Sequence, residues 1–469
     1  MGTPKAVPAA LAVYAEKLHS EGKEFKVGLI TGGATGSQVD SALAQAHAVA
    51  FRTPFQSNKE MRNAINAGEV QYYDVHLSQI GQDVRYGFLG DIDVAIVEAS
   101  DITEEGDIVL STSVGISPTL IQVAHKVIIE LNEAHASKLT GMHDIYIPDA
   151  PPYRREIPIY RVNDRAGSIS VRVNPEKVVG VVRTNERDRI AAFTPLNDTT
   201  SRIGQNVADF LLGEYQRGAI PREFLPLQSG VGNIANAVLG ALGADKKLPA
   251  FSMYTEVIQN SVIDLMMQER IRFVAGSSLT LSDDRLDMLY DNIDVMKERV
   301  LLRPQEITNH PEMIRRLGII AVNTALEADI FGNVNSTHVL GSKMMNGIGG
   351  SADFARNAYL SIFTTPSTAK DGLISSMVPH VSHVDSTEHD VRILVTEQGV
   401  ADLRGKSPSQ RARCIIENCA HPDYKELLWD YLKLSEGKGC HTPMSLRNAL
   451  KMHIAFAETG DMRNTKFEM

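Results

Sequence analysis

The chain has few cysteines, and their spacing matches no known framework. Its 469 residues include three of them, Cys414, Cys419 and Cys440. These lack the CxxC or Cys/His spacing of disulfide scaffolds and zinc sites. The sequence therefore predicts neither disulfides nor a metal site, and it fits a reducing compartment.

Long apolar runs and long basic runs are absent as well. Without an apolar run of about 18 residues or a secretory segment, we expect no membrane contact. The expected location is the cytoplasm, or a matrix such as that of mitochondria if a transit segment is missing here. The formal net charge of −10, with no clustered Lys or Arg, excludes a nucleic-acid footprint.

What is present is an ordinary globular composition, with 43% hydrophobic and 22% charged residues. Short apolar runs alternate with amphipathic stretches such as 8–20 and 204–218, which is typical of parallel sheets covered by helices. A polar, patternless segment at 185–200 marks the approach to a domain boundary. We predict two tandem α/β domains with mainly parallel sheets, residues 1–190 and 191–469. The expected strands lie within 25–31, 92–99, 126–131, 178–184, 248–255, 271–276, 318–330 and 391–397.

One carboxylate, Glu256, follows the apolar run Ala250–Thr255, which is expected to be a strand. The residues Ile258, Val262 and Leu265 then recur at helical spacing, so a helix should begin close to Glu256. Ligands of α/β proteins bind at the carboxyl ends of strands, and a helix dipole there favours an ionised carboxylate. Glu256 is therefore a candidate nucleophile. The alternative is a helix-initiating glutamate with an electrostatic role only.

Three glycine-rich stretches adjoin expected strands or helices. They are Gly28–Gln38, the pair Gly230 and Gly232 before a helical run, and the segment with Gly347 and Gly350. Glycine allows close approach of a ligand, and the amides of a following helix favour phosphate. Each stretch could also be only a tight turn.

Two other enzyme classes fail on sequence context. Gly347-x-Gly349-x-x-Ala352 matches a relaxed dinucleotide fingerprint, but no good strand precedes it and no acidic residue ends the next apolar run. A G-x-S-x-G nucleophile elbow does not occur. A carboxylate remains the candidate nucleophile.

Other polar residues have simpler interpretations. Glu397 ends an expected strand shortly before a glycine, which is a ligand-facing position. Glu327 lies among apolar residues and is expected to be a buried, paired acid. His380, His383 and His389 are too loosely spaced for a metal motif, so we expect hydrogen-bonded or solvated histidines.

Several blocks resemble, in the same order, the acetyl-CoA hydrolase/CoA-transferase family. Within that family the resemblance is to class I CoA-transferases that act on succinyl-CoA and acetate, or on propionyl-CoA and succinate. It extends from Gly2 to the C-terminal region. The blocks are PLQSGVGNIANAV, MYTEVIQNS, RPQEITNHPEMIRRLG, NVNSTHVLGSKMMNGIGGSADFARNAYLSIF and VTEQGVADLRGKSP.

The resemblance implies two tandem CoA-transferase-type (NagB/RpiA/CoA-transferase-like) domains with the active site between them. Glu256 then corresponds to the nucleophile that becomes a glutamyl-CoA thioester. Asn309 and Glu397 resemble residues that position the reacting groups, and Arg189 resembles an arginine from the N-terminal domain. The residues that match CoA contacts are Gly230, Val231, Gly232, Asn233, Ile234, Asn346, Gly350 and Lys370.

The implied activity is CoA transfer between an acyl-CoA and a short-chain carboxylic acid. Coenzyme A is then a substrate, no cofactor is bound permanently, and a homodimer is usual. Two alternatives stay open, namely acyl-CoA hydrolysis and a CoA-binding protein without catalysis.

The chain departs from the family pattern in a few places. Relatives carry a few dozen residues, including a strand, before the GTPK segment at Gly2–Lys5. We expect a truncation at this end, which would remove one strand of the N-terminal domain. Ser386 stands where relatives often have His, and His380 where they often have Met. Neither belongs to the inferred catalytic set.

Overall fold

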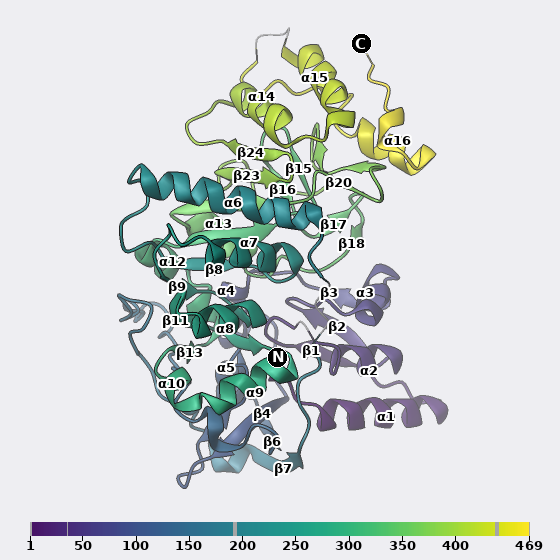
Figure 1. Cartoon of the computed structure of the whole chain (residues 1–469). Helices are drawn as coiled ribbons and strands as arrows, with labels where there is room; N and C mark the ends of the chain where they lie inside the picture. Colours follow the sequence, from purple (N-terminus) through teal and green to yellow (C-terminus); the bar gives the residue numbers. More distant parts are fainter. Residues whose placement is uncertain (1, 35, 191–194, 437–439, 469) are drawn as a thin grey trace. The chain divides into compact units, whose positions relative to one another are not determined.

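Figure 1 shows the computed structural model of the chain, which describes residues 2–34, 36–190, 195–436 and 440–468. Its first compact unit comprises Met1–Ala192, Phe251–Leu317 and Asn346–Asp353. The second comprises Phe193–Ala250, Gly318–Met345 and Phe354–Met469. The first unit thus takes chain from both sides of the boundary predicted after residue 190, and that boundary stays a prediction.

The first unit begins with two small sheets. Strands β1 (Val27–Ile30), β2 (Val49–Thr53) and β3 (Gln71–Tyr72) are parallel. Helices α1 (Ala6–Ser20), α2 (Asp40–Gln45) and α3 (Lys59–Asn66) lie beside them, in purple in Figure 1. Apolar residues of these elements form one buried cluster, which includes Leu43, Val49 and Met61.

The second sheet of this unit has the order β5-β4-β6-β7. Its strands β4, β6 and β7 are parallel, and β5 is antiparallel at the edge. Helix α4 (Leu77–Arg85) precedes this sheet along the chain and α5 (Ser117–Val123) lies within its connections. The strands span Val94–Ile102 (β4), Ile108–Leu110 (β5), Lys126–Asn132 (β6) and Val178–Thr184 (β7).

Further parallel strands of the first unit come from its middle segment, 251–317. Strand β11 (Ile271–Gly276) lies between β9 (Phe251–Tyr254) and β13 (Val300–Leu302), and β10 (Val257–Gln259) pairs with β12 (Ser278–Thr280). The helices of this segment are α8 (Asn260–Met267), α9 (Asp283–Asp291), α10 (Ile293–Lys297), α11 (Gln305–Thr308) and α12 (Pro311–Leu317).

The second unit contains the strand order β8-β14-β19-β23-β24. The first four strands are parallel, and β24 returns antiparallel to β23. They span Leu227–Ser229 (β8), Ile320–Thr324 (β14), Leu360–Thr364 (β19), Ile393–Thr396 (β23) and Gly399–Asp402 (β24). Short pairings are made by β15 (Glu327–Asp329), β16 (Val334–Asn335), β17 (His338–Val339), β18 (Lys343–Met344), β20 (Thr368–Ala369), β21 (Ile374–Ser375) and β22 (Met377–Val378).

The long helices of the second unit include α6 (Asp198–Gln216) and α7 (Asn233–Ala244), which run side by side in Figure 1. Gly204 of α6 allows the close approach, since a Cβ there would lie 2.6 Å from the carbonyl of Ala237. Further helices of this unit include α14 (Pro408–Cys419), α15 (Pro422–Glu436) and α16 (Lys451–Thr459), while α13 (Ser351–Asn357) has its first three residues in the first unit.

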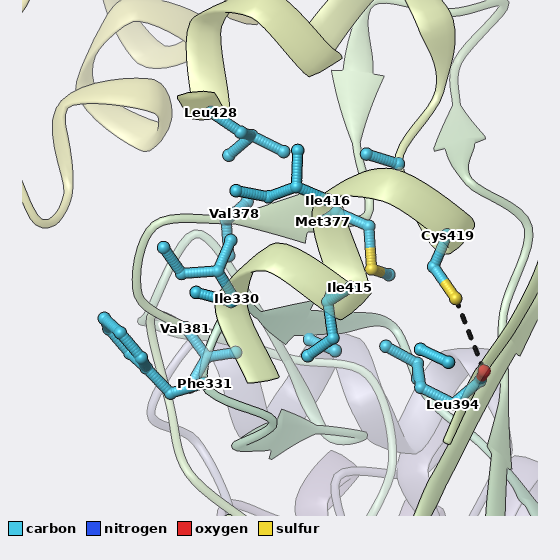
Figure 2. Close-up of a cluster of buried hydrophobic side chains, with 14 of the residues drawn as sticks. Ile330, Phe331, Met377, Val378, Val381, Leu394, Ile415, Ile416, Cys419 and Leu428 are labelled. Atoms are coloured by element: carbon cyan, nitrogen blue, oxygen red, sulfur yellow. Dashed lines mark hydrogen bonds between the residues drawn. The ribbon is translucent and has the colours of Figure 1, made fainter. Parts of the chain in front are cut away.

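A cluster of buried apolar side chains fills the space beneath α14 and α15 (Figure 2). Ile330, Val378 and Ile415 are among its fully buried members. The thiol of Cys419 belongs to this cluster, and it donates to the carbonyl of Leu394 at 3.3 Å. Burial raises the pKa of Cys419 to about 12, so this thiol is a packing group and not a nucleophile.

All eight predicted strand regions contain a strand, and the α/β architecture with mainly parallel sheets is confirmed. The predicted helix start at Glu256 is wrong. The strand β10 follows Glu256 directly, and α8 begins only at Asn260. The β-branched residues Val257 and Ile258 are buried in the parallel pairing with β12, and this pairing overrides the helical spacing. Within the described ranges, no helix is both long and apolar enough to cross a membrane.

Candidate active site

Glu256 lies between β9 and β10, and its backbone is fixed by neighbouring strands. Its carbonyl accepts hydrogen bonds from the N–H groups of Ser277 at 2.7 Å and Ser278 at 3.2 Å. The preceding residue, Thr255, donates its N–H to Ala275 at 2.9 Å. These bonds hold the point from which the Glu256 side chain leaves the sheet.

Two glycines lie against the Glu256 carboxylate. A Cβ at Gly33 would be 2.6 Å from Oε1, and a Cβ at Gly350 would be 3.3 Å from Oε2. The Gly350 position is also closed by Asn309, whose Oδ1 would lie 2.1 Å from that Cβ. A larger residue at either place would require the Glu256 or Asn309 side chain to shift. Glycine backbone therefore borders both oxygens of the carboxylate.

The side chain of Gln305 ties the Gly33 loop to α4. Its Oε1 accepts from the N–H of Gly33 at 3.0 Å, and its Nε2 donates to the carbonyl of Leu77 at 3.2 Å. Gln305 is buried at the start of α11. The same helix therefore positions the glycine loop and, at its C-terminal end, Asn309.

Asn309 presents an acceptor, because its amide donors are already used. Its Nδ2 donates to the Gln305 carbonyl at 3.0 Å and to Thr308 Oγ1 at 3.1 Å. Its Oδ1 is buried beside Gly350 and accepts no hydrogen bond in the part of the chain that the structure describes. Asn309 therefore holds a buried acceptor oxygen beside Gly350 that no described residue uses.

The environment of Glu256 disfavours its charge. Burial raises the pKa of Glu256 to about 7, and the negative charge of Asp353 adds to the increase. The expectation that a helix dipole favours the ionised form is therefore wrong, because the nearest following helix starts four residues later, at Asn260. A carboxylate with such a pKa is more basic, and hence more nucleophilic, than one in water.

Asp353 is a second buried carboxylate near Glu256. It accepts hydrogen bonds from Ser78, at 2.6 Å from Oγ and 3.1 Å from the backbone N–H. Burial raises the pKa of Asp353 to about 7, although these two hydrogen bonds lower it. Neither Asp353 nor Ser78 was selected from the sequence as a site residue.

A buried ion pair joins the two helices that frame this site. Arg85 of α4 binds Glu306 of α11 through two bonds of 2.8 Å each. The side chains are 10% and 5% exposed. Because α4 carries Ser78 and Asn309 directly follows α11, this pair fixes the spacing of the elements around Glu256.

The other predicted residues of the first unit have different surroundings. Asn346 lies in the segment that leads to Gly350, and its Nδ2 donates to the Gly347 carbonyl at 2.9 Å. Arg189 is exposed, and its guanidinium binds Glu186 at 2.7 Å. The structure thus gathers Glu256, Asn309 and Gly350 at one place, while Arg189 contacts Glu186 with its guanidinium and Gln38 with its backbone N–H at 3.0 Å.

The remaining predicted residues belong to the second unit. Gly232, with φ of 105°, precedes α7, so the loop Gly230–Ile234 ends in a helix N-terminus. Lys370 is exposed, with its ammonium 5.0 Å from the Phe456 ring centroid. Glu397 accepts from the hydroxyl and the N–H of Ser367. Burial raises the pKa of Glu397, but these bonds and one from Gln398 outweigh it, and the net pKa is lowered.

Glu327 is the buried, paired acid that the sequence predicts. Its carboxylate binds His453 Nε2 at 2.8 Å and accepts from Asn335 and Ser382, also at 2.8 Å. Of the three histidines considered from the sequence, His380 Nδ1 lies 2.9 Å from the Val381 carbonyl and His383 lies 3.3 Å from the Asp385 carboxylate, while His389 is exposed. Across the described residues, no group of three or more His, Cys, Asp or Glu side chains is arranged to hold a metal.

The fold resembles two solved structures, one of which is a CoA-transferase. RipA from Yersinia pestis superimposes with a TM-score of 0.71, covering 92% of both chains at 22% identity. A 4-hydroxybutyrate CoA-transferase from Porphyromonas gingivalis gives a TM-score of 0.60, covering 90% of this chain and 96% of the other at 22% identity. The class of fold is therefore that of CoA-transferases, as predicted.

Sequence comparison then places the chain within one family. The acetyl-CoA hydrolase/transferase N-terminal domain matches residues 1–183, and the corresponding C-terminal domain matches residues 286–432. The propanoyl-CoA:succinate CoA transferase of Escherichia coli is 49% identical over 98% of this chain and 93% of its own. The chain belongs to the acetyl-CoA hydrolase/transferase family of enzymes, as the sequence blocks predict.

Relatives of both kinds of activity are similar to this chain. The succinyl-CoA:acetate CoA-transferase of Clostridium kluyveri is 49% identical over 98% of this chain and 85% of its own. The acetyl-CoA hydrolase of Saccharomyces cerevisiae is 44% identical over 100% of this chain and 91% of its own. Overall similarity to relatives therefore does not separate transfer from hydrolysis.

Proposed function

We propose that the protein transfers CoA between an acyl-CoA and a short-chain carboxylic acid, with Glu256 as the covalent nucleophile. The observation that carries this proposal is the Glu256 carboxylate itself. It is desolvated, close to Asp353, and bordered on both oxygens by glycine backbone. Such a carboxylate has raised basicity, and the glycines that border it carry no side chain between it and the backbone.

The proposed chemistry is acyl exchange that conserves one negative charge. A Glu256 oxygen attacks the thioester carbonyl, the C–S bond breaks, and CoA leaves as thiolate. The thiolate attacks the Glu256 carbonyl of the resulting anhydride, which forms glutamyl-CoA and releases the first carboxylate. The acceptor carboxylate then runs the same two steps in reverse and regenerates Glu256.

Residues around Glu256 would support these steps in distinct ways. We propose that backbone amides near Gly350 stabilise the oxyanion and that the free Oδ1 of Asn309 accepts an N–H of the bound CoA. The role of Glu397 in positioning the reacting groups, and the match of Arg189 to an arginine from the N-terminal domain, stay predictions from the family resemblance. The predicted contacts with the CoA phosphates lie at Lys370 and at the helix N-terminus after Gly232.

The proposal predicts how adduct formation depends on pH. Only ionised Glu256 can attack, and its pKa is raised to about 7. The rate of glutamyl-CoA formation from acyl-CoA alone should therefore fall about tenfold for each pH unit below 7 and level off above it. Stopped single-turnover reactions, followed by mass spectrometry of the Glu256 peptide, measure this rate. A flat profile between pH 5 and 7 would contradict an ionising nucleophile of this kind.

Hydrolysis of the acyl-CoA is the second candidate, because acetyl-CoA hydrolases are also among the relatives. It differs only in whether water or a carboxylate resolves the glutamyl-CoA. We expect CoA exchange with acetate, propionate or succinate to exceed acceptor-free thiol release by at least about tenfold. The reason is that desolvation of the site disfavours attack by water. Exchange is measured with labelled acceptor and release with a thiol reagent. Equal rates with and without acceptor would assign hydrolysis instead.

The family resemblance predicts that the protein is a homodimer. Sedimentation of the purified chain measures its oligomeric state.

The remaining alternative is a CoA-binding protein without catalysis. Such a protein would bind CoA but would not exchange it with acetate, propionate or succinate.

A further inference from the structure

We infer that Asp353 is a positioning residue for the proposed nucleophile. Two hydrogen bonds from Ser78 favour the charged form of its carboxylate near Glu256, and the repulsion between the two carboxylates is released when Glu256 becomes acylated. Asp353 has this role only if Glu256 is the nucleophile, so the inference rests on the proposed function and deepens it.

The geometry places the two carboxylates in one small cluster. Asp353 lies three positions after Gly350, the glycine that lies against Glu256 Oε2. Asp353 is 6% exposed. Ser78 follows Leu77, whose Cδ1 lies 3.3 Å from the Cβ position of Gly33. That same position is 2.6 Å from Glu256 Oε1. The elements that hold Asp353 are therefore those that border Glu256.

The hydrogen bonds of Ser78 favour the charged form of Asp353. A hydroxyl at 2.6 Å and a backbone N–H at 3.1 Å both donate to its oxygens. The N–H comes from the first turn of α4, where an anion is also favoured by the helix dipole. The hydrogen bonds from Ser78 therefore favour ionisation of Asp353 before that of Glu256.

Several charged and titratable groups on the surrounding elements have other partners, and burial lowers the pKa of His310, which follows Asn309. On α11 and α4, Glu306 is neutralised by Arg85. Burial and the charge of Glu306 raise the pKa of Asp83. Before the Gly350 turn, the Asp74 carboxylate accepts the N–H of Ile348 at 2.9 and 3.0 Å. Tyr72, which burial keeps protonated, donates to Pro54.

The consequence for catalysis follows from the change in charge at the site during the reaction. Two carboxylates at one desolvated site repel each other, because a low dielectric screens them poorly. Attack on the thioester removes the charge of Glu256 and leaves that of Asp353. The free enzyme is therefore raised in energy relative to glutamyl-CoA, and Glu256 is kept basic.

The test compares pH profiles of glutamyl-CoA formation for four full-length proteins. Asp353→Asn removes the charge and keeps an acceptor for Ser78, and Ser78→Ala removes one hydrogen bond to Asp353. Asp291→Asn makes the same charge change at an exposed residue of the first unit and serves as the control. We expect the fall in rate on the acid side of the profile, called the acid limb, to begin at a lower pH in both variants. The shift should be about one unit in Asp353→Asn and smaller in Ser78→Ala. The limb should stay in place in Asp291→Asn.

The outcomes separate this inference from the proposed function. If the wild type forms no adduct at any pH, the proposed function fails. If the wild type forms it, and the limb stays or moves upward in both Asp353→Asn and Ser78→Ala, only the role of Asp353 is overturned. Should Asp353→Asn fail to fold, judged by circular dichroism, the shift in Ser78→Ala decides.

Discussion

Replacing Glu256 by glutamine is expected to reduce CoA exchange by at least about three orders of magnitude, which is the usual effect of deleting a covalent nucleophile. The carboxamide keeps the shape of the side chain between Gly33 and Gly350 but cannot attack a thioester. Exchange is measured with labelled acetate and succinyl-CoA. Mass spectrometry should also find no CoA on the peptide that contains residue 256.

Stability provides the control for this variant. The folded-state pKa of Glu256 is about 7, above its ordinary value of 4.5. Its contribution to stability is therefore complete below pH 4.5 and is lost as the pH rises through 7. The glutamine variant lacks this loss, so at pH 8 its melting temperature should equal or exceed that of the wild type. Glu298→Gln, at an exposed position of the same unit, should change neither activity nor melting. Near-wild-type exchange in Glu256→Gln would exclude the covalent scheme.

Local sequence patterns predict the strands well because burial on both faces of a parallel sheet requires continuous apolar runs. The run 248–255 contains β9, and Glu256 follows directly after it. The same patterns fail at the helix start. The spacing of Ile258, Val262 and Leu265 is compatible with a helix from Glu256, but Ile258 lies in β10 and only the other two lie in α8. Pairing with β12, whose residues lie 21 positions further on, decides between the two.

The surroundings of Glu256 depend on contacts that no local pattern contains. Ser78 and Asp353 are 275 residues apart in sequence, and Gly33 and Gln305 are 272 apart. The family resemblance identified Glu256, Asn309 and Gly350, which the structure brings together. It did not identify Asp353, although that residue lies inside a matching block, because the block says nothing of its burial. The direction of the Glu256 pKa shift likewise follows from tertiary burial.

Replacing Arg85 by methionine is expected to destabilise the protein by about 3 to 5 kcal/mol, because it leaves Glu306 buried without its main counter-charge. The pair has two bonds of 2.8 Å and side chains that are 10% and 5% exposed. Arg154, 3.5 Å from Glu306, keeps part of the compensation and favours the lower end of the range. Urea denaturation at unchanged slope measures the free energy of unfolding.

Two further variants make the cause specific. Arg183→Met breaks an exposed pair with Glu133, in which the side chains are 78% and 53% exposed, and should cost only about 0 to 1 kcal/mol. In Arg85→Met/Glu306→Gln no carboxylate is left unpaired, so much of the lost stability should return. If Arg85→Met lowers the free energy of unfolding no more than Arg183→Met does, the ion pair between Arg85 and Glu306 does not stabilise the protein. If the pair does hold α4 against α11, Arg85→Met also loosens Ser78 and Asn309. Its CoA exchange should then fall even at temperatures where the protein remains folded.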